Sequence, residues 1–400
     1  MTFDFTTMLD RVGKDAMAIE ALGIPGGFAP GAPQPGYDAI PMWVADMNFP
    51  TAPSVTQAIV ERAQHPAFGY FMPPKAYYDA IINWWKTRHG STGIKPEHIG
   101  YQNGVLGGVA SACGAFTAPG DKVLVHTPTY IGFTHAIERC GRFLEHSPLI
   151  RDENGVWRMD YDDMDRRIRE HNIGLAVLCS PFNPCGRVWE RWELERAAEV
   201  YRENDVVVVA DEIWADLVWK GHEHIPFHTI SEDARRRTIT LSAASKTFNL
   251  AGLVGSYDIV FDRRLRERLY AQGKSSYYND MNVLSMHALI GGYSPEGAAW
   301  VDELQTVLGT NVNLACDFID AAPGLEAFRP QGTYMIFVDC TEWCSAHGKT
   351  IDELEQALWD VGVTVQDGRM FGGACHIRMN VALPQAKVEE ALERMERVLA

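Results

Sequence analysis

Three apolar runs in the middle of the chain each lead into a polar residue that could bind a ligand. The runs are residues 175–179, 206–210 and 238–242. Short continuous apolar runs are typical of strands that are buried on both faces of a parallel sheet. The carboxyl ends of such strands meet at one edge of the sheet, where ligands bind. We therefore expect Asn183, Asp211 and Lys246, which follow the three runs, to lie at the same edge.

Helix-like patterns alternate with these runs. The segment 189–201 carries an apolar face flanked by Glu and Arg, and 122–126 is a further strand candidate. The alternation predicts an α/β fold with a large, mostly parallel, doubly wound sheet over residues 51–290. Residues 23–50 are rich in Gly and Pro and predict an extended arm.

The pattern changes after residue 291 and predicts a smaller α/β domain. Helices are expected at 300–322, 351–361 and 385–399, and strands at 334–338, 363–365 and 377–380. We therefore expect a large domain at 51–290 and a small domain at 291–400. The arm, residues 1–50, is expected to pack on the small domain and on a dimer partner.

Charge and composition exclude several classes of function. The chain has 400 residues and a formal net charge of -16, which disfavours nucleic acid and anionic membranes as partners. The charged N-terminal segment 1–20 does not resemble a signal peptide, and no apolar run approaches a membrane span. We expect a cytoplasmic protein. The eight cysteines are scattered and predict free thiols, and the clusters at 221–228 and 340–347 lack zinc-site spacing, so we predict no metal.

The three polar residues match the needs of pyridoxal 5′-phosphate (PLP), whose chemistry requires a lysine amine, a carboxylate for the pyridine nitrogen and a donor for the ring hydroxyl. Lys246 has hydroxyl and apolar neighbours, a setting that lowers an amine pKa. Asp211 follows four valines, where a buried carboxylate needs a cation. The structural alternatives are an exposed helix-start lysine, a helix-capping aspartate and, for Asn183, a simple turn.

Two further segments could complete such a site. The Gly-rich run 103–109 precedes a helix of small residues, so the backbone N–H groups of Gly104, Val105 and Leu106 could bind phosphate. Tyr130 could stack on the pyridine ring, and Arg378, between apolar neighbours, suits a substrate carboxylate. The alternatives are an ordinary interface aromatic and a structural ion pair.

Six motifs, in this order along nearly the whole chain, resemble fold-type I PLP enzymes of the class I/II aminotransferase superfamily. They are Pro41–Met47, Phe68–Tyr70, Cys179–Pro184, Gly186–Trp189, Asp211–Ile213 and Ser245–Asn249. Within the superfamily, the similarity is greatest to the cystathionine β-lyase and cysteine C–S lyase branch.

The resemblance implies a role for each site residue. Lys246 would form the Schiff base, Asp211 would contact the pyridine nitrogen and Asn183 the ring oxygen, and Lys246, Tyr130 and Asp211 would be the catalytic residues. Arg378, Asn183 and Trp43 would bind substrate. Tyr70 would reach the cofactor phosphate of a neighbouring subunit, which implies a homodimer with shared active sites.

The sequence also departs from the superfamily pattern. Val254 stands where many aminotransferases have a phosphate-binding arginine, and the lyase branch commonly lacks that arginine too. Ala243 replaces a common serine, which leaves Ser242 and Ser245 as phosphate donors. Trp214 replaces a Tyr or His, and an indole cannot accept a proton. Cys185 replaces a threonine, which we expect to be a packing change.

The resemblance implies β-elimination from L-cystathionine or a related cysteine thioether, giving thiol, pyruvate and ammonia, within amino-acid metabolism such as methionine biosynthesis. One alternative is a PLP-dependent aminotransferase. Another is a PLP-binding regulatory protein with incidental lyase activity.

Overall fold

In the computed structural model, which describes residues 2–400, the chain divides into two compact units. The large unit comprises Thr51–Phe182 and Arg187–Val301. The small unit comprises Met1–Pro50, Asn183–Gly186 and Asp302–Ala400. Each unit has its own sheet.

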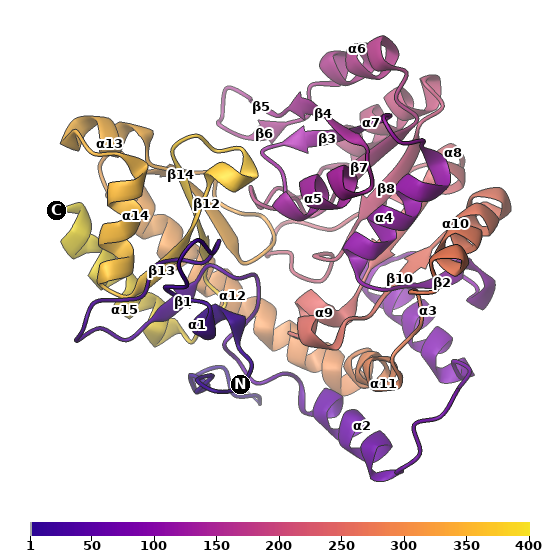
Figure 1. Cartoon of the computed structure of the whole chain (residues 1–400), viewed down its shortest axis with the longest axis horizontal. Helices are drawn as coiled ribbons and strands as arrows, with labels where there is room; N and C mark the ends of the chain where they lie inside the picture. The colour runs from indigo at the N-terminus through magenta and orange to yellow at the C-terminus, as the bar shows by residue number, and fades with distance from the viewer. Residues whose placement is uncertain (1) are drawn as a thin grey trace. The chain divides into compact units, whose positions relative to one another are not determined.

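The large unit is built on a seven-stranded sheet with the order β2-β10-β9-β8-β7-β3-β4 (Figure 1). The strands are β2 (Ile99–Gln102), β3 (Lys122–Thr127), β4 (Phe143–Pro148), β7 (Leu175–Cys179), β8 (Val207–Asp211), β9 (Thr238–Ser242) and β10 (Ser256–Ile259). Strands β4, β3, β7, β8 and β9 run parallel, whereas β10 is antiparallel to both β9 and β2. The predicted mostly parallel sheet is confirmed.

Helices cover both faces of this sheet, which explains why all five residues of β7 and of β9 are buried. On one face, α4 packs against α5 and α10, and on the other α7 packs against α6 and α8 (Figure 1). These helices are α4 (Val105–Phe116), α5 (Ile131–Arg139), α6 (Tyr161–His171), α7 (Arg191–Glu203), α8 (Glu232–Arg237) and α10 (Arg263–Ser276). The amphipathic α7 buries Leu194, Ala197 and Tyr201, because these residues recur at helical spacing.

The remaining elements of the large unit are short or peripheral. Helices α2 (Pro53–Gln64) and α3 (Lys75–His89) pack against α11 (Val283–Gly292). Strands β5 (Ile150–Arg151) and β6 (Trp157–Arg158) form a small hairpin. The one-turn helix α9 (Ala244–Thr247) follows β9.

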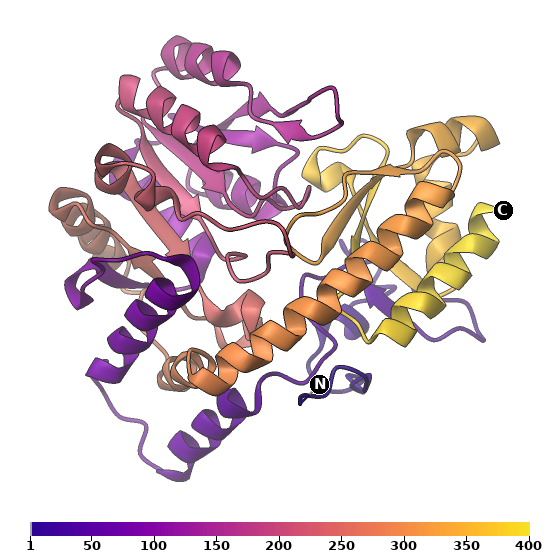
Figure 2. The ribbon, with the colours of Figure 1, turned by 180° about the vertical axis from the view of Figure 1, so that it is seen from behind.

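The small unit is built on a five-stranded sheet with the order β1-β13-β14-β12-β11. The strands are β1 (Ile40–Met42), β11 (Glu326–Ala327), β12 (Met335–Asp339), β13 (Val363–Asp367) and β14 (His376–Asn380). The Gly- and Pro-rich arm supplies β1, which pairs in parallel with β13. In the reverse view, the later part of α12 (Pro295–Ala321) and α15 (Gln385–Leu399) cross this sheet (Figure 2).

Helices α13 (Thr341–His347), α14 (Ile351–Asp360) and the short α1 (Met17–Glu20) complete the small unit. A buried asparagine on α12 ties this helix to the segment after β14, because Asn311 Nδ2 donates to the carbonyls of Val381 (2.9 Å) and Leu383 (2.7 Å). No helix among residues 2–400 is long and apolar enough to cross a membrane.

Most predicted strands are confirmed, with 175–179 and 238–242 matching β7 and β9. The run 206–210 is displaced by one residue, because β8 ends at Asp211 and includes it. The apolar pattern predicted neither β2 nor β10. Their buried polar residues, Gln102 and Asp258, interrupt the apolar pattern on which strand prediction depends.

Candidate active site

The carboxyl ends of β7, β8 and β9 are tied together by backbone hydrogen bonds. The N–H of Ser180 donates to the carbonyl of Asp211, and the N–H of Glu212 donates to the carbonyl of Leu241, both at 2.9 Å. Asp211 is the last residue of β8, and Lys246 lies in α9 just beyond β9. The structure therefore brings Asp211 and Lys246 to one edge of the sheet, as the sequence predicted.

Asp211 is a buried carboxyl group whose ionisation is opposed by its surroundings. Burial raises the pKa of Asp211 to about 7, although the N–H of Ile213 (3.1 Å) and the charge of Lys246 act in the opposite direction. A carboxylate in such a place is stable only beside a cation or a strong donor. The end of β8 thus offers a binding position for a positively charged group.

Lys246 lies beside a buried indole. Its Nζ is 5.5 Å from the centre of the Trp214 ring, a cation–π distance, and Trp214 is itself buried. Tyr or His at this position could exchange a proton with a bound ligand, but Trp214 cannot accept one. In this chain residue 214 therefore packs against the lysine.

A cluster around Asp216, which the sequence analysis missed, fixes the helix that carries Lys246. The buried carboxylate of Asp216 accepts hydrogen bonds from Thr247 Oγ1 (2.8 Å), Trp84 Nε1 (3.0 Å) and His89 Nε2 (2.9 Å). Burial opposes the ionisation of Asp216, but His89 and Arg88 outweigh it and lower its pKa. Because Thr247 follows Lys246 directly, this cluster holds α9 against α3. The sequence signal was an aspartate inside the apolar run Trp214–Leu217.

The first turn of α4 supplies backbone donors at the same edge. Gly104 caps this helix at φ 82°, a conformation that favours glycine, and Val105 and Leu106 begin it. The first N–H groups of a helix have no carbonyl partner within it and are suited to bind an anion.

The ring of Tyr130 lies near this turn. A Cβ at Gly132 would lie 2.4 Å from the Tyr130 ring and 2.9 Å from Cδ1 of Leu106, so both side chains occupy the space that Gly132 leaves open. The glycine that admits Tyr130 beside the start of α4 was also missed by the sequence analysis.

The other residues of the large unit that were predicted to bind the cofactor differ in how exposed they are. Ser242 is buried and its Oγ donates to the carbonyl of Glu212 (3.5 Å), whereas Ser245 is half-buried in α9. Tyr70 is fully exposed, in the segment between α2 and α3, and shares no described contact with Asp211 or Lys246.

In the small unit, the structure brings together the three residues that were predicted to bind substrate. The buried Arg378 on β14 donates to Asn183 Oδ1 (3.3 Å) and to the carbonyl of Trp43 (3.0 Å). Its guanidinium also lies over the ring of Phe371, 4.0 Å from the ring centre. An arginine held in this way presents a fixed planar donor to a carboxylate. Phe371 was not predicted, because nothing in its local sequence marks it.

Among residues 2–400, no group of three or more His, Cys, Asp or Glu side chains is arranged to hold a metal ion.

Comparison with known proteins decides the family. The family described as "Aminotransferase class I and II" matches residues 38–395. The chain belongs to this family.

Its relatives include proteins named for carbon–sulfur bond cleavage. The chain is 36% identical to cystathionine beta-lyase PatB of Bacillus subtilis (91% of this chain, 93% of PatB) and 30% identical to protein MalY of Escherichia coli (98% and 97%). The PLP-bound C–S lyase of Staphylococcus hominis superposes with a TM-score of 0.88 at 30% identity, covering 99% of each chain. This member of the family is a PLP-dependent C–S lyase.

The residues described above fit PLP. The buried carboxyl of Asp211 has a raised pKa because burial disfavours its charge, and a protonated pyridine nitrogen would supply the missing cation. Lys246 lies at the same edge, and the first turn of α4 offers N–H donors suited to a phosphate.

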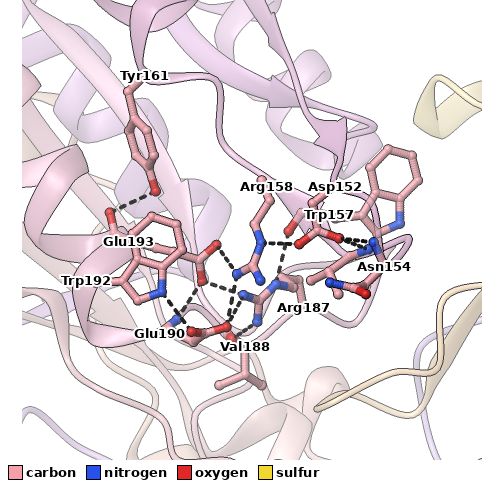
Figure 3. Close-up of polar contacts among 11 residues, drawn as sticks. Asp152, Asn154, Trp157, Arg158, Tyr161, Arg187, Val188, Glu190, Trp192 and Glu193 are labelled. Carbon is pink, nitrogen blue, oxygen red and sulfur yellow. Dashed lines mark hydrogen bonds and ion pairs between the residues drawn. The ribbon is translucent and has the colours of Figure 1, made fainter.

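The family motif Gly186–Trp189 is anchored by a buried ion-pair network (Figure 3). Arg187, fully buried, pairs with the fully buried Glu193 and with Glu190 at 3.1 Å, and its Nε donates to the carbonyl of Trp157 (3.0 Å). Arg158 joins this network through Glu193 at 3.0 Å. The carbonyl of Arg187 accepts from the N–H of Phe182 (2.7 Å), so the network fixes the chain at this strand-like bridge.

Removing one partner of the buried Arg187–Glu193 pair should strongly destabilise the protein. Glu193→Leu leaves the Arg187 charge without its buried partner, and we expect the free energy of unfolding to fall by about 3–5 kcal/mol. The double variant Arg187→Met/Glu193→Leu should recover most of this loss. The exposed pair Arg196–Glu199 on α7 provides a control, since its removal should have little effect. Additive losses in the double variant, measured by urea denaturation, would contradict a coupled pair.

The pKa of Asp211 predicts the pH dependence of apoprotein stability. A raised native pKa means that the folded apoprotein keeps a proton that the unfolded chain has lost. This contribution to stability is complete below pH 4 and is lost as the pH rises through about 7. Relative to Asp211→Asn, the wild-type apoprotein should therefore lose up to about 1.4 kcal/mol per pH unit across this range. Parallel stability curves for the two apoproteins would contradict the assignment.

Proposed function

We propose that the protein catalyses β-elimination of L-cystathionine or a related cysteine thioether, releasing a thiol, pyruvate and ammonia. The observation that carries this proposal is the pairing of a buried carboxyl, Asp211, with a lysine, Lys246, at one edge of the parallel sheet. The cystathionine substrate is suggested by the name of PatB and by the restraint of Arg378, which suits an amino-acid carboxylate.

Each residue of the proposed site has its own role in binding PLP. Lys246 would hold the cofactor covalently, Asp211 would pair with its pyridine nitrogen, and Tyr130 would stack on its ring. The amide of Asn183 would donate to the ring oxygen. The phosphate would be bound by the N–H groups of Val105 and Leu106 and by the hydroxyls of Ser242 and Ser245. Gly104, whose own N–H donates to the carbonyl of Gln102, would shape the turn instead.

The substrate is held through its α-carboxylate by Arg378. The contacts of this guanidinium with Asn183 and with the backbone of Trp43 restrict its rotation. A restrained guanidinium loses less conformational freedom when it forms a bidentate pair.

Lys246 is the general base: its amine, freed when the amine of the substrate takes its place, removes the α-proton of the substrate. Bound PLP supplies an electron sink for the negative charge left at Cα. Asp211 stabilises positive charge at the position of the sink, an electrostatic contribution in a buried setting. The Cβ–S bond breaks and its electron pair leaves with sulfur as thiolate, which takes up a proton. Water then hydrolyses the released enamine to pyruvate and ammonia.

We also propose that the protein is a cytoplasmic homodimer that acts in methionine biosynthesis. Its N-terminal arm would pack on the partner, and Tyr70 would reach the partner's phosphate site. The segment between α2 and α3 supports this, because Phe68 is 56% exposed, Met72 88% and Tyr70 fully exposed. Exposed aromatic and apolar side chains close together in one segment are typical of an interface.

The central test is the reaction itself. With L-cystathionine and no keto acid, the purified protein should release free thiol and pyruvate in equal amounts. Lys246→Ala should lower this rate by at least about 10²-fold and abolish the visible absorbance of the lysine-bound cofactor, because general base and covalent anchor are both lost. Lys220→Ala, at an exposed lysine, is the matched control.

Keto-acid-dependent amino transfer without thiol release would instead identify an aminotransferase. Undiminished cofactor absorbance in Lys246→Ala would contradict the assignment of the lysine. A panel of cysteine thioethers, measured by thiol release, then identifies the preferred substrate.

A further inference from the structure

Strand β10 contains a buried carboxyl group to which the proposed reaction gives no role. Asp258 is only 3% exposed, on a strand between β2 and β9. Its Oδ2 accepts a hydrogen bond from Gln102 Nε2 at 2.8 Å. Burial raises the pKa of Asp258 to about 6, opposed by hydrogen bonds from the Gln102 side chain and the Gly100 backbone and by the charge of Arg266. A buried carboxyl of this kind costs stability, so its partners indicate what it does.

The neighbouring strand leaves space for this carboxyl group. Gly100 pairs directly with Asp258 across the two antiparallel strands. A Cβ at position 100 would lie 2.5 Å from Oδ2 and 2.7 Å from Oδ1 of Asp258. Only glycine at this position lets the carboxyl group reach both the Gln102 side chain and the Gly100 backbone.

From Asp258 a chain of hydrogen bonds leads to the turn before α4. Gln102 Oε1 accepts from Asn279 Nδ2 (2.9 Å) and from Ser111 Oγ (3.1 Å). Asn279 Oδ1 in turn accepts from the backbone N–H of Asn103 (2.9 Å). The N–H of Gly104 donates to the backbone carbonyl of Gln102 (3.0 Å). The turn is thus held on both sides by groups that Gln102 orients.

The direction of the Gln102 amide is the feature that Asp258 controls. A primary amide has donors on one end and an acceptor on the other. Because a carboxylate only accepts, Asp258 requires the NH₂ end of Gln102 to face β10. The oxygen then faces Asn279 and Ser111, which donate to it. With the amide reversed, Asn279 and Ser111 would lose their acceptor.

We infer that Asp258 is a positioning residue that, through Gln102 and Asn279, holds the Asn103–Gly104 turn in the geometry that binds the cofactor phosphate. This inference rests on the proposed function of that turn. Asp258 touches neither cofactor nor substrate, and its effect is confined to the phosphate end of the cofactor.

The test compares PLP with pyridoxal, which lacks the phosphate, in binding to the full-length apoprotein. Asp258→Asn keeps one acceptor oxygen and cannot serve both donors. Gly100→Ala keeps the charge but pushes the carboxyl group away from Gln102. In both variants the dissociation constant for PLP should rise about 10-fold, the cost of one buried hydrogen bond left unmade. The constant for pyridoxal should change less than about twofold.

Inorganic phosphate binding to the apoprotein should weaken in parallel with PLP binding. The matched control is Thr240→Val. Thr240 lies on the adjacent strand β9, and this change removes its buried hydrogen bond with His228 (2.9 Å). Thr240→Val should lower the thermal midpoint of unfolding about as much as Asp258→Asn does, but it should leave the ratio of PLP to pyridoxal affinity unchanged.

An equal loss of affinity for PLP and pyridoxal in Asp258→Asn, or no loss for either, would overturn the inference. If Asp258→Asn does not fold, Gly100→Ala and Gln102→Leu carry the same comparison. If the wild-type apoprotein binds pyridoxal as tightly as PLP, the turn does not bind the phosphate, and this inference is wrong as well. Thiol release by the wild-type enzyme tests the lyase function separately.

Discussion

The proposed active site depends on a carboxyl group placed where burial opposes its charge. Asp211 closes a strand of valines, and burial raises its pKa to about 7. A fold tolerates a buried carboxyl group when that group pairs with a cation that is present only in the cofactor-bound protein. The lysine nearby reduces the cost without removing it. The protonated pyridine nitrogen of PLP is a cation of suitable chemistry, so the cost in the apoprotein and the proposed catalytic use of Asp211 have the same physical origin.

The directions of the strands in the large sheet bring the other residues of the site to the same edge as Asp211. Parallel strands β7, β8 and β9 end at one edge. Strand β10 is antiparallel to both β9 and β2, so β2 runs in the same direction as β9 and its last residue, Gln102, lies at that edge just before the first turn of α4. Buried polar clusters then fix the loops that leave the sheet. Asp216 holds α9, and Arg187 with Glu193 holds the bridge at Phe182. Such clusters contribute little net stability, but they restrict the conformations available to the residues beside them.

Sequence reasoning succeeded where a single local pattern was sufficient. The valines before Asp211 and the apolar run before Lys246 predicted both strands and the edge that they share. Sequence reasoning failed for strands β2 and β10, because the buried polar residues Gln102 and Asp258 break the apolar run that identifies a buried strand. It also missed Asp216 and Gly132, whose importance depends on contacts with residues distant in the chain. The hydrogen bond between Arg378 and Asn183 joins residues 195 positions apart, and no local pattern specifies it.

The proposed function depends most directly on which lysine carries the cofactor. Borohydride reduction of the purified protein fixes PLP on the amine that holds it, and mass spectrometry of the peptides then locates the added group. We predict the phosphopyridoxyl mass on the peptide that contains Lys246 and on no other lysine. A modified peptide from elsewhere in the chain, or a protein that carries no such group after incubation with PLP, would contradict the account.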